Sequence, residues 1–527
     1  MRVSTGSTAA LPTMFLPVAG VRTLALALAC TLASALFTWL VLTPAIGFDD
    51  ANITLAYAEN IAAGHGYVYN IGGERVEGST SPLWTAVTTL AFLLPYAPET
   101  TLAVLGLLIA WATVWQSMRL GETAFALAGL DARGAALPVG LGFLALPAVF
   151  GWTVWSLMDF GFWVLLTVVA IRLVVALALG RSEAPVTAGL AAVAALLAVT
   201  RPEGVAVALA FGLLAALLGG RDGRRAGALA AASGVLAFGA VALLRLAYFG
   251  DIFPNTYYAK VSTDHVSQLA QGVDYLVGFL SSPVNAGILG LAALLPLSGA
   301  VRARRASLGR AWAATLLAVA GGMALYVLIG GDHFGSWRFF LFAYPALLPF
   351  AALALRLLWD ALPARRRHPA APWLLAAALL VATSASFAVH KGNYVRELRI
   401  AEQGREMGRI LNRLPGAPSI AIVAAGGIAM TYEGHIYDLL GLNWVEMARA
   451  DRDQVGAYVN HGGFSKAVFY DTLPEIVHPQ FGACDRAAYD GNRFFGKVLR
   501  GLLAEPEFQS LYRFECFEGL RFYRRVG

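Results

Sequence analysis

The chain has 527 residues, of which 58% are hydrophobic and only 14% are charged, and its formal net charge is +6. Soluble domains carry about 25% charged residues, so this composition excludes a soluble globular protein and predicts a polytopic α-helical membrane protein. The excess positive charge lies in short clusters between apolar runs, which is typical of a topology signal, and we expect no nucleic-acid partner.

The first apolar run, from about 21 to 44, is long enough to cross a membrane. The segment Met1–Gly20 lacks the pattern of a signal peptide, so we expect this run to be retained as a span. Further apolar runs of spanning length follow at 101–120, 134–153, 160–180, 186–200, 203–219, 226–249, 272–297, 310–330, 339–359 and 371–389.

Basic clusters separate these runs and predict the topology. They lie at 119–133, 172–181, 221–225, 302–310 and 356–367. All of them fall inside the cell if the N-terminus is cytoplasmic and residues 82–97 lie on the membrane surface. This agreement predicts about eleven spans in a transmembrane domain over residues 1–390, with residues 391–527 outside. The predicted outer loops are 45–100, 154–160, 250–271 and 331–338.

Two adjacent carboxylates, Asp49 and Asp50, follow the first apolar run by a few residues. A dehydrated charge at a bilayer surface is costly, so the pair needs a reason to be there. The stretch 51–63 favours a helix that ends at Gly64, and one aspartate would suffice to cap it. Adjacent helical residues point about 100° apart, so the two carboxylates can have different roles. We expect at least one to be a general base, with Asp50 favoured; capping alone is the alternative.

The remainder of the first outer loop, which we expect to carry the catalytic residues, contains tight turns and a second helix start. Ser81 and Pro82 are typical of an N-cap followed by the first helical position. Trp84 is interpreted as an anchor at the membrane interface. Glu77 has no evident structural role, so it is either a substrate-binding residue or a solvated loop carboxylate.

Three cations lie in outer loops, where the positive-inside rule gives no reason for them: Arg201, Lys260 and Arg338. Such a cation can pair with a lipid head group, a carboxylate or a phosphorylated ligand, and we predict that the three bind a donor phosphate. Arg201 has the alternative of pairing with Glu203 in a structural turn.

Polar and aromatic residues beside these cations are candidate substrate-binding residues, with Glu203 and Glu77. Tyr257 and Tyr258 precede Lys260, and Asp332 and His333 precede Arg338. For His333 a hydrogen-bonded loop histidine is the alternative, because no nearby cluster supplies the other ligands of a metal site.

Residues 391–527 are more polar and alternate between helical and strand patterns, which predicts a small extracytoplasmic α/β domain. We expect strands at 419–425, 466–470 and 520–524, and helices near 395–413 and 493–503. Two cysteines in such a domain often pair, so Cys484 and Cys516 are predicted to form a disulfide. Acceptor recognition and a purely stabilising role are both open for this domain.

The ordered motifs of the outer loops resemble the terminal arabinofuranosyltransferases of the mycobacterial cell wall and their bacterial relatives, which are GT-C class enzymes. The matching residues in the first loop are Asp49-Asp50, Gly64-His-Gly66, Asn70, Gly73–Glu77 and Thr80-Ser81. Those further along are Ser156–Asp159, Thr200–Gly204, Pro254–Lys260, Gly330–Asp332 with Arg338-Phe-Phe, and Asp438–Leu442. The resemblance covers roughly 45–445 and departs at Met158-Asp159, where relatives tend to have Leu-Glu.

The resemblance implies a GT-C-like bundle in the bacterial cytoplasmic membrane, with its active site on the outer face. It implies an inverting transfer of a sugar, arabinofuranose, from a polyprenyl-phosphate donor to a glycan, lipid or protein acceptor. Carried over, Asp50 or Asp49 deprotonates the acceptor hydroxyl, and the cations hold the donor phosphate. Mannose or another hexose remains an alternative sugar.

Two other functions fit a membrane protein of this composition: a flippase or transporter of lipid-linked glycans, and a polymerase or ligase of surface polysaccharide. Transporters place ionisable residues near the bilayer midplane, whereas here they gather at one face, which favours the transferase. Transfer from a polyprenyl phosphate needs no metal in principle. A divalent ion is nevertheless possible, because Asp49 and Asp50 could supply ligands, and its presence is left open.

Overall fold

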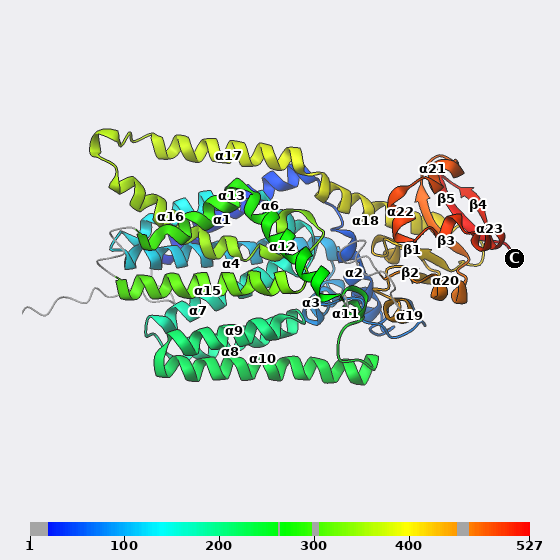
Figure 1. Ribbon diagram of the computed structural model, residues 1–527, viewed down its shortest axis with the longest axis horizontal. Helices are drawn as coiled ribbons and strands as arrows, with labels where there is room; N and C mark the ends of the chain where they lie inside the picture. Colours follow the sequence, from blue (N-terminus) through cyan, green and yellow to red (C-terminus); the bar gives the residue numbers. More distant parts are fainter. Residues whose placement is uncertain (1–18, 262–263, 298–304, 451–462) are drawn as a thin grey trace, which may run out of the picture.

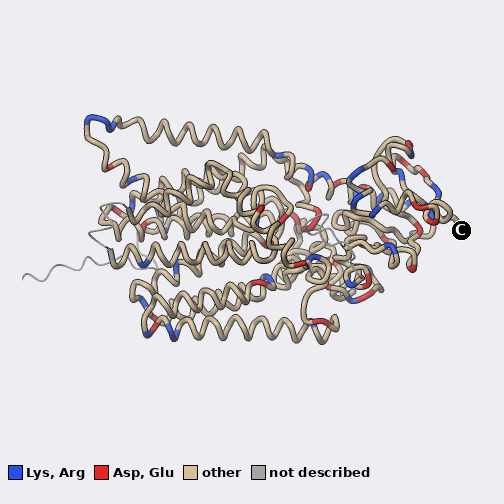
Figure 2. The backbone as a smooth tube through the Cα atoms, in the orientation of Figure 1, with Lys and Arg blue, Asp and Glu red and all other residues tan. Residues whose placement is uncertain are grey.

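The protein is described here from a computed structural model, which covers residues 19–261, 264–297, 305–450 and 463–527. A long helical bundle, from α1 (Ala19–Leu42) to α17 (Ala371–His390), is followed by a smaller α/β domain that begins with α18 (Gly392–Leu411) (Figure 1). Many Lys and Arg residues of the bundle lie at its end far from that domain (Figure 2). The predicted basic residue Arg302 lies outside the described residues.

Six helices in the described ranges are long and apolar enough to cross a membrane. They are α1, α4 (Pro98–Leu127), α7 (Phe160–Ala178), α10 (Gly220–Phe249), α15 (Arg305–Leu328) and α17. Two bent pairs raise the number to eight if each pair is one span. Adding the helices α8 (Ala184–Thr200), α9 (Gly204–Leu218) and α16 (Ala343–Ala361) to these eight would give the eleven predicted spans. The count of eleven and the orientation stay predictions.

Two runs that the sequence presents as single spans are bent. The run 134–153 forms α5 (Ala136–Leu144), α6 (Pro147–Phe150) and a π-helix η2 (Gly151–Trp155), with a bend of 74° before Pro147. The run 272–297 forms α12 (His265–Ser281) and α13 (Pro283–Leu294), with a bend of 86° at Ser282. Proline has no N–H to continue a helix and fits the first position of a new one, so each break precedes a proline.

Small residues let the outermost helices pack closely. A Cβ atom added to Gly212 of α9 would lie 2.7 Å from the backbone oxygen of Gly227 in α10. One added to Gly227 would lie 2.2 Å from the Gly212 oxygen. Without a hydrophobic driving force in lipid, this close backbone approach supplies the contact that holds the two helices together.

Three short helices lie between the bundle and the C-terminal domain (Figure 1): α2 (Asp49–Ala62), α3 (Pro82–Phe92) and α11 (Asn255–Lys260). Helix α3 begins as predicted, because the Ser81 side chain accepts the backbone N–H of Trp84 and Pro82 takes the first position. The interpretation of Trp84 as an interfacial anchor is wrong. Its side chain is buried, and its indole N–H donates to the Leu157 oxygen at 3.0 Å.

The C-terminal domain contains a five-stranded sheet with the order β2-β1-β3-β5-β4. Strands β2, β1 and β3 are parallel, whereas β3, β5 and β4 are antiparallel neighbours. The strands are β1 (Ile420–Ile422), β2 (Ile436–Asp438), β3 (Ile476–Phe481), β4 (Tyr512–Phe517) and β5 (Leu520–Arg525). The helices include η6 (Gly427–Met430), α19 (Val445–Arg449), α20 (Lys466–Thr472), α21 (Arg486–Asp490), α22 (Arg493–Val498) and α23 (Pro506–Leu511).

The predicted strand at 466–470 is wrong, because these residues form helix α20. A short apolar run fits a strand and a buried helix equally well by periodicity alone. Phe469 is fully buried against Phe508 and Tyr512, and the sheet position beside β1 is occupied by β3 instead. The predicted strands at 419–425 and 520–524 correspond to β1 and β5.

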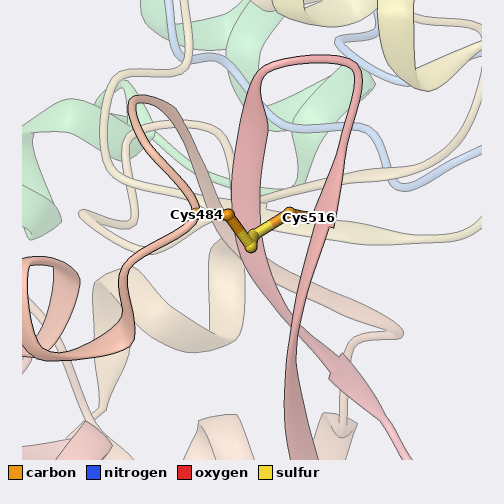
Figure 3. Close-up of a disulfide and its surroundings, with 2 residues drawn as sticks. All are labelled: Cys484 and Cys516. Carbon is orange, nitrogen blue, oxygen red and sulfur yellow. A yellow bond between two sulfur atoms is a disulfide. The ribbon is translucent and has the colours of Figure 1, made fainter.

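A disulfide joins Cys484, which precedes α21, to Cys516 in β4 (Figure 3). The two residues are 32 positions apart in the sequence. The bond therefore fastens the segment after β3 to the edge strand of the sheet. Cys30 is buried and free in α1.

Removal of the disulfide should destabilise the C-terminal domain. For a loop of this length the loss of chain entropy in the unfolded state corresponds to about 3–4 kcal/mol. We expect Cys484→Ser/Cys516→Ser to lower the midpoint of thermal unfolding and to make the domain sensitive to limited proteolysis, while Cys30→Ala changes neither. An unchanged proteolysis rate in the double variant would contradict this.

Candidate active site

Neither aspartate of the pair caps helix α2. The N-cap position is Phe48, which makes no side-chain capping bond, and Asp49 and Asp50 occupy the first turn. Carboxylates are favourable there because the helix dipole places partial positive charge at its N-terminus. The capping interpretation is therefore wrong, and the side chains of the two residues point to different partners.

Asp49 is buried against the C-terminal domain. Its carboxylate accepts the backbone N–H of Gly427 at 2.7 Å and of Gly426 at 3.1 Å. Burial raises the pKa of the Asp49 carboxyl to about 6, although both N–H groups act in the opposite direction. Asp49 is 7% exposed, so this carboxylate is held in place by backbone groups and has little open surface.

Asp50 is directed toward a different partner, the guanidinium of Arg338. Its carboxylate lies 3.9 Å from Arg338 Nη1, and its side chain is 28% exposed. Arg338 belongs to η4 (Gly335–Phe340), and its Nε and Nη2 donate to the two carboxylate oxygens of the buried Asp332. The Asp332 pair thus fixes the guanidinium and directs its Nη1 toward Asp50.

Aromatic rings surround Arg338 and Arg201 together. The Arg338 guanidinium lies 4.0 Å from the ring centroid of Phe334 and 5.0 Å from that of Phe160. The Arg201 guanidinium lies 5.1 Å from the same Phe160 centroid and 5.6 Å from that of Phe339. Rings at these distances stabilise a cation and exclude water. The structure therefore brings two of the three predicted cations into one cluster.

Arg201 is already neutralised by protein carboxylates. Its Nε donates to Glu203 at 2.7 Å, and its Nη1 lies 3.0 Å from an Asp159 oxygen. Glu203 also accepts the hydroxyl of Tyr326 at 3.3 Å. These contacts favour the alternative in which Arg201 and Glu203 form a structural turn.

Lys260 ends α11 and stands beside the same cluster. Burial lowers the pKa of its ammonium, and Asp50 is the carboxylate that opposes this shift most. Within the described residues no carboxylate oxygen lies within 4.0 Å of its Nζ, in contrast to both arginines. Lys260 is therefore the cation with the most capacity left for an anionic ligand.

The sequence analysis missed a third carboxylate at the site, Glu397 of α18. It is buried, and its pKa is raised to about 7, first by burial and then by the negative charges of Asp50 and Asp49. Glu397 lies on the apolar face of α18, with Tyr394 and Leu398. A carboxylate inside such a stripe was the signal that could have identified it.

Glu77 is a buried structural residue in this conformation. Its carboxylate accepts Nε of Arg245 at 2.7 Å and Nη2 at 3.1 Å, and both side chains are nearly inaccessible. This pair ties the first outer loop to α10. The alternative of a solvated loop carboxylate is wrong, and a substrate contact would require the Arg245 pair to open.

The remaining candidates lie at different distances from the cluster. His333 Nδ1 is 3.5 Å from Asp332 Oδ1, so this histidine borders the site. Tyr258 donates its hydroxyl to Asp251 at 3.2 Å, and the Tyr257 ring stacks on Phe253 at 4.6 Å. These two tyrosines therefore face a neighbouring surface. In the described ranges no group of three or more His, Cys, Asp or Glu residues could hold a metal ion.

No family model matches the chain, and no curated protein matches it in sequence. Among solved structures it is similar to ArnT from Cupriavidus metallidurans bound to undecaprenyl phosphate, with 15% identity and a TM-score of 0.49 over 79% of this chain and 85% of ArnT. The apo state of the same protein gives 16% identity and 0.49 over 80% and 88%. A likeness this low does not establish a common function, so the proposal below depends on the site itself.

Glu77 should stabilise the folded protein through its ion pair with Arg245. We expect Glu77→Leu to lower the free energy of unfolding by about 3–5 kcal/mol, because it leaves a buried cation unpaired. Glu77→Leu/Arg245→Leu should regain most of this loss in thermal unfolding of the purified protein. Arg356→Leu, which breaks an exposed pair with Asp360, is the matched control and should cost little. Additive losses in the double variant would contradict the pairing.

Glu397 should make stability depend on pH. Its pKa is raised in the folded protein, so its stabilising contribution is complete below about pH 4.5 and is lost as the pH rises through about 7. We expect Glu397→Gln to raise the unfolding midpoint at pH 8 and to flatten the profile between pH 5 and 8. Glu402→Gln, exposed on the same helix, should leave the profile unchanged. A profile that Glu397→Gln does not alter would disprove this contribution.

Proposed function

We propose that this protein is a membrane glycosyltransferase of the GT-C type, which moves a sugar from a polyprenyl-phosphate donor to an acceptor hydroxyl with inversion. The observation that carries the proposal is the juxtaposition of Asp50 with Arg338 and Lys260. One carboxylate with open surface stands 3.9 Å from a fixed guanidinium, beside the Lys260 ammonium, which has no carboxylate oxygen within 4.0 Å in the described part of the chain. A base and a phosphate site are the two elements that this reaction needs.

In the proposed reaction Asp50 removes the proton from the acceptor hydroxyl as its oxygen attacks the anomeric carbon of the sugar. The bond between that carbon and the phosphate oxygen breaks, and the electron pair leaves with the polyprenyl phosphate. The products are the glycosylated acceptor, the polyprenyl phosphate and a proton on Asp50. Attack opposite the leaving group inverts the configuration of the anomeric carbon.

The cations would stabilise charge that develops during this step. The donor is a phosphodiester with one negative charge, whereas the released polyprenyl phosphate is a monoester that carries up to two. In this proposal Arg338 Nη1 and Lys260 Nζ receive the additional charge, and preorganised cations of this kind are a large source of rate enhancement. Arg201 is neutralised by two carboxylates, so its role in this proposal is to hold the neighbouring residues of the site in position.

The finer assignments extend this proposal. Arabinofuranose as the sugar follows from the resemblance of the loop motifs, with a hexose as the alternative. We place the active site on the outer face of a bacterial cytoplasmic membrane, because the basic clusters lie at the opposite end of the bundle (Figure 2). A glycan, a lipid or a protein can serve as acceptor in this scheme.

The test uses the purified protein with a panel of polyprenyl-phosphate sugars, including arabinofuranose and mannose, and a mixture of glycan, lipid and peptide acceptors. Mass spectrometry identifies the product, and the released polyprenyl phosphate gives the rate. We expect Asp50→Asn to lower kcat by roughly 10²–10⁴-fold, which is the usual contribution of a general base. Lys260→Met should lower kcat and also raise KM for the donor, because Lys260 would bind the phosphate and stabilise its additional charge. Asp131→Asn, far from the site, should change neither constant.

Two outcomes would overturn the proposal. Release of polyprenyl phosphate that persists in Asp49→Ala/Asp50→Ala would exclude this pair from the chemistry. Movement of the donor across a vesicle membrane without cleavage of the sugar–phosphate bond would identify a flippase.

A further inference from the structure

The side chain of Asp49, in the first turn of α2, is bound by the C-terminal domain. Both carboxylate oxygens of Asp49 accept backbone N–H groups, from Gly426 and Gly427. The two glycines form the turn that leads into η6, which packs against both α2 and α18. We call this contact of Asp49 with Gly426 and Gly427 the clasp.

The clasp leaves no room for a side chain at either glycine. A Cβ atom at Gly426 would lie 1.8 Å from the backbone oxygen of Asp49 and 2.9 Å from its Cγ. A Cβ atom at Gly427 would lie 2.1 Å from the backbone oxygen of Ala401 in α18. The turn is therefore wedged between two helices, so that a side chain there would push α2 and α18 apart.

The geometry of Asp49 differs from that of a group that reacts with substrate. Asp49 is 7% exposed, and the clasp occupies both its oxygens, whereas Asp50 is directed toward Arg338. The two residues are neighbours on one helical turn, about 100° apart. A rotation or shift of the first turn of α2 would therefore move Asp50 relative to Arg338 and Lys260.

Further contacts fix the rest of α2 to the same domain and to α18. The Tyr57 hydroxyl lies 3.1 Å from Asn443 Oδ1, and Asn443 in turn donates to the buried Asp438. The Arg405 guanidinium of α18 donates to Asn52 Oδ1 at 2.6 and 2.9 Å. The clasp is the member of this set that lies next to Asp50.

We propose that Asp49 is a positioning residue, and that the Gly426–Gly427 turn of the C-terminal domain belongs to the catalytic centre because it holds Asp50 against the phosphate-binding cations. This inference rests on the proposed function for the role of Asp50, and on the clasp geometry for the role of Asp49. The C-terminal domain thereby has a function in the transfer itself, in addition to any contact with the acceptor.

The experiment is a double-mutant cycle in the full-length protein, with Asp49→Ala, Gly426→Ala and the combination. Each single variant should lower kcat by about 10–100-fold with KM for the donor nearly unchanged, because a displacement of about 1 Å can cost 10²-fold. The combined variant should be no worse than Gly426→Ala alone, because the added methyl group already displaces the turn whose N–H groups Asp49 accepts. Gly496→Ala, whose added methyl group meets open space in α22, is the matched control and should keep full activity.

Asp49→Asn keeps the shape of the side chain and one accepting oxygen, so it tests the clasp without a risk to folding. We expect its kcat to lie between those of the wild type and Asp50→Asn. An Asp49→Asn variant as inactive as Asp50→Asn, together with a fully active Gly426→Ala variant, would overturn the inference and assign Asp49 to the chemistry. Additive losses in the cycle would overturn it as well.

Thermal unfolding of the same four proteins separates this inference from the proposed function. Coupling between Asp49 and Gly426 in the unfolding midpoint is expected whatever reaction the protein catalyses. Coupling with no transfer activity in the wild type would count against the proposed function alone. Transfer activity without coupling in either readout would count against the clasp alone.

Discussion

The buried ion pair of Asp332 with Arg338 is the interaction on which the rest of the site depends. It connects the segment after α15 with η4, which precedes α16. The chain around this pair adopts left-handed conformations at Gly331 (φ 67°), Ser336 (φ 64°) and Trp337 (φ 47°). For residues with a side chain each such conformation costs about 1–2 kcal/mol. A bidentate pair in a water-poor site can offset that cost, and it fixes the direction of the guanidinium.

The charged residues around this pair differ in how far protein groups neutralise them. Arg201 is paired with Asp159 and Glu203, and its guanidinium shares the Phe160 ring with that of Arg338. The rings keep water out, which strengthens electrostatic interactions inside the cluster and makes an unpaired charge costly. Asp50 and Lys260 are the members of the cluster whose charge the protein satisfies least. The unsatisfied pair therefore marks the place where a charged substrate would complete the arrangement.

Local patterns in the sequence predicted much of the fold. The apolar runs correspond to helices, the Ser81 cap and Pro82 start α3, and Asp50 does lie close to the predicted cations. What could not be predicted depends on distant partners. Glu77 appeared to have no structural role because its partner Arg245 lies 168 residues away on α10. Capping remained an alternative for Asp49 because its true partners lie in another domain.

The other errors also depend on tertiary packing. The run 466–470 has no feature that separates a short helix from a strand, so the choice depended on which segment occupies the place beside β1. Glu397 was overlooked because its helix was assigned to the C-terminal domain, away from the first loop. Its burial beside Asp49 and Asp50 follows from the way α18 packs on α2, which no pattern within 395–413 specifies.

The sequence separation across the clasp has a consequence for how the protein is made. Asp49 and Gly426 are 377 residues apart, and nearly all of the helical bundle is synthesised between them. At 5–20 residues per second the first outer loop waits roughly 20–75 s for its partner to emerge. During that time Asp49 is a hydrated carboxylate, and α2 lacks the C-terminal domain as a packing partner. The bundle can therefore insert and pack before the reactive end takes its final form, so that assembly ends with the step that completes the site.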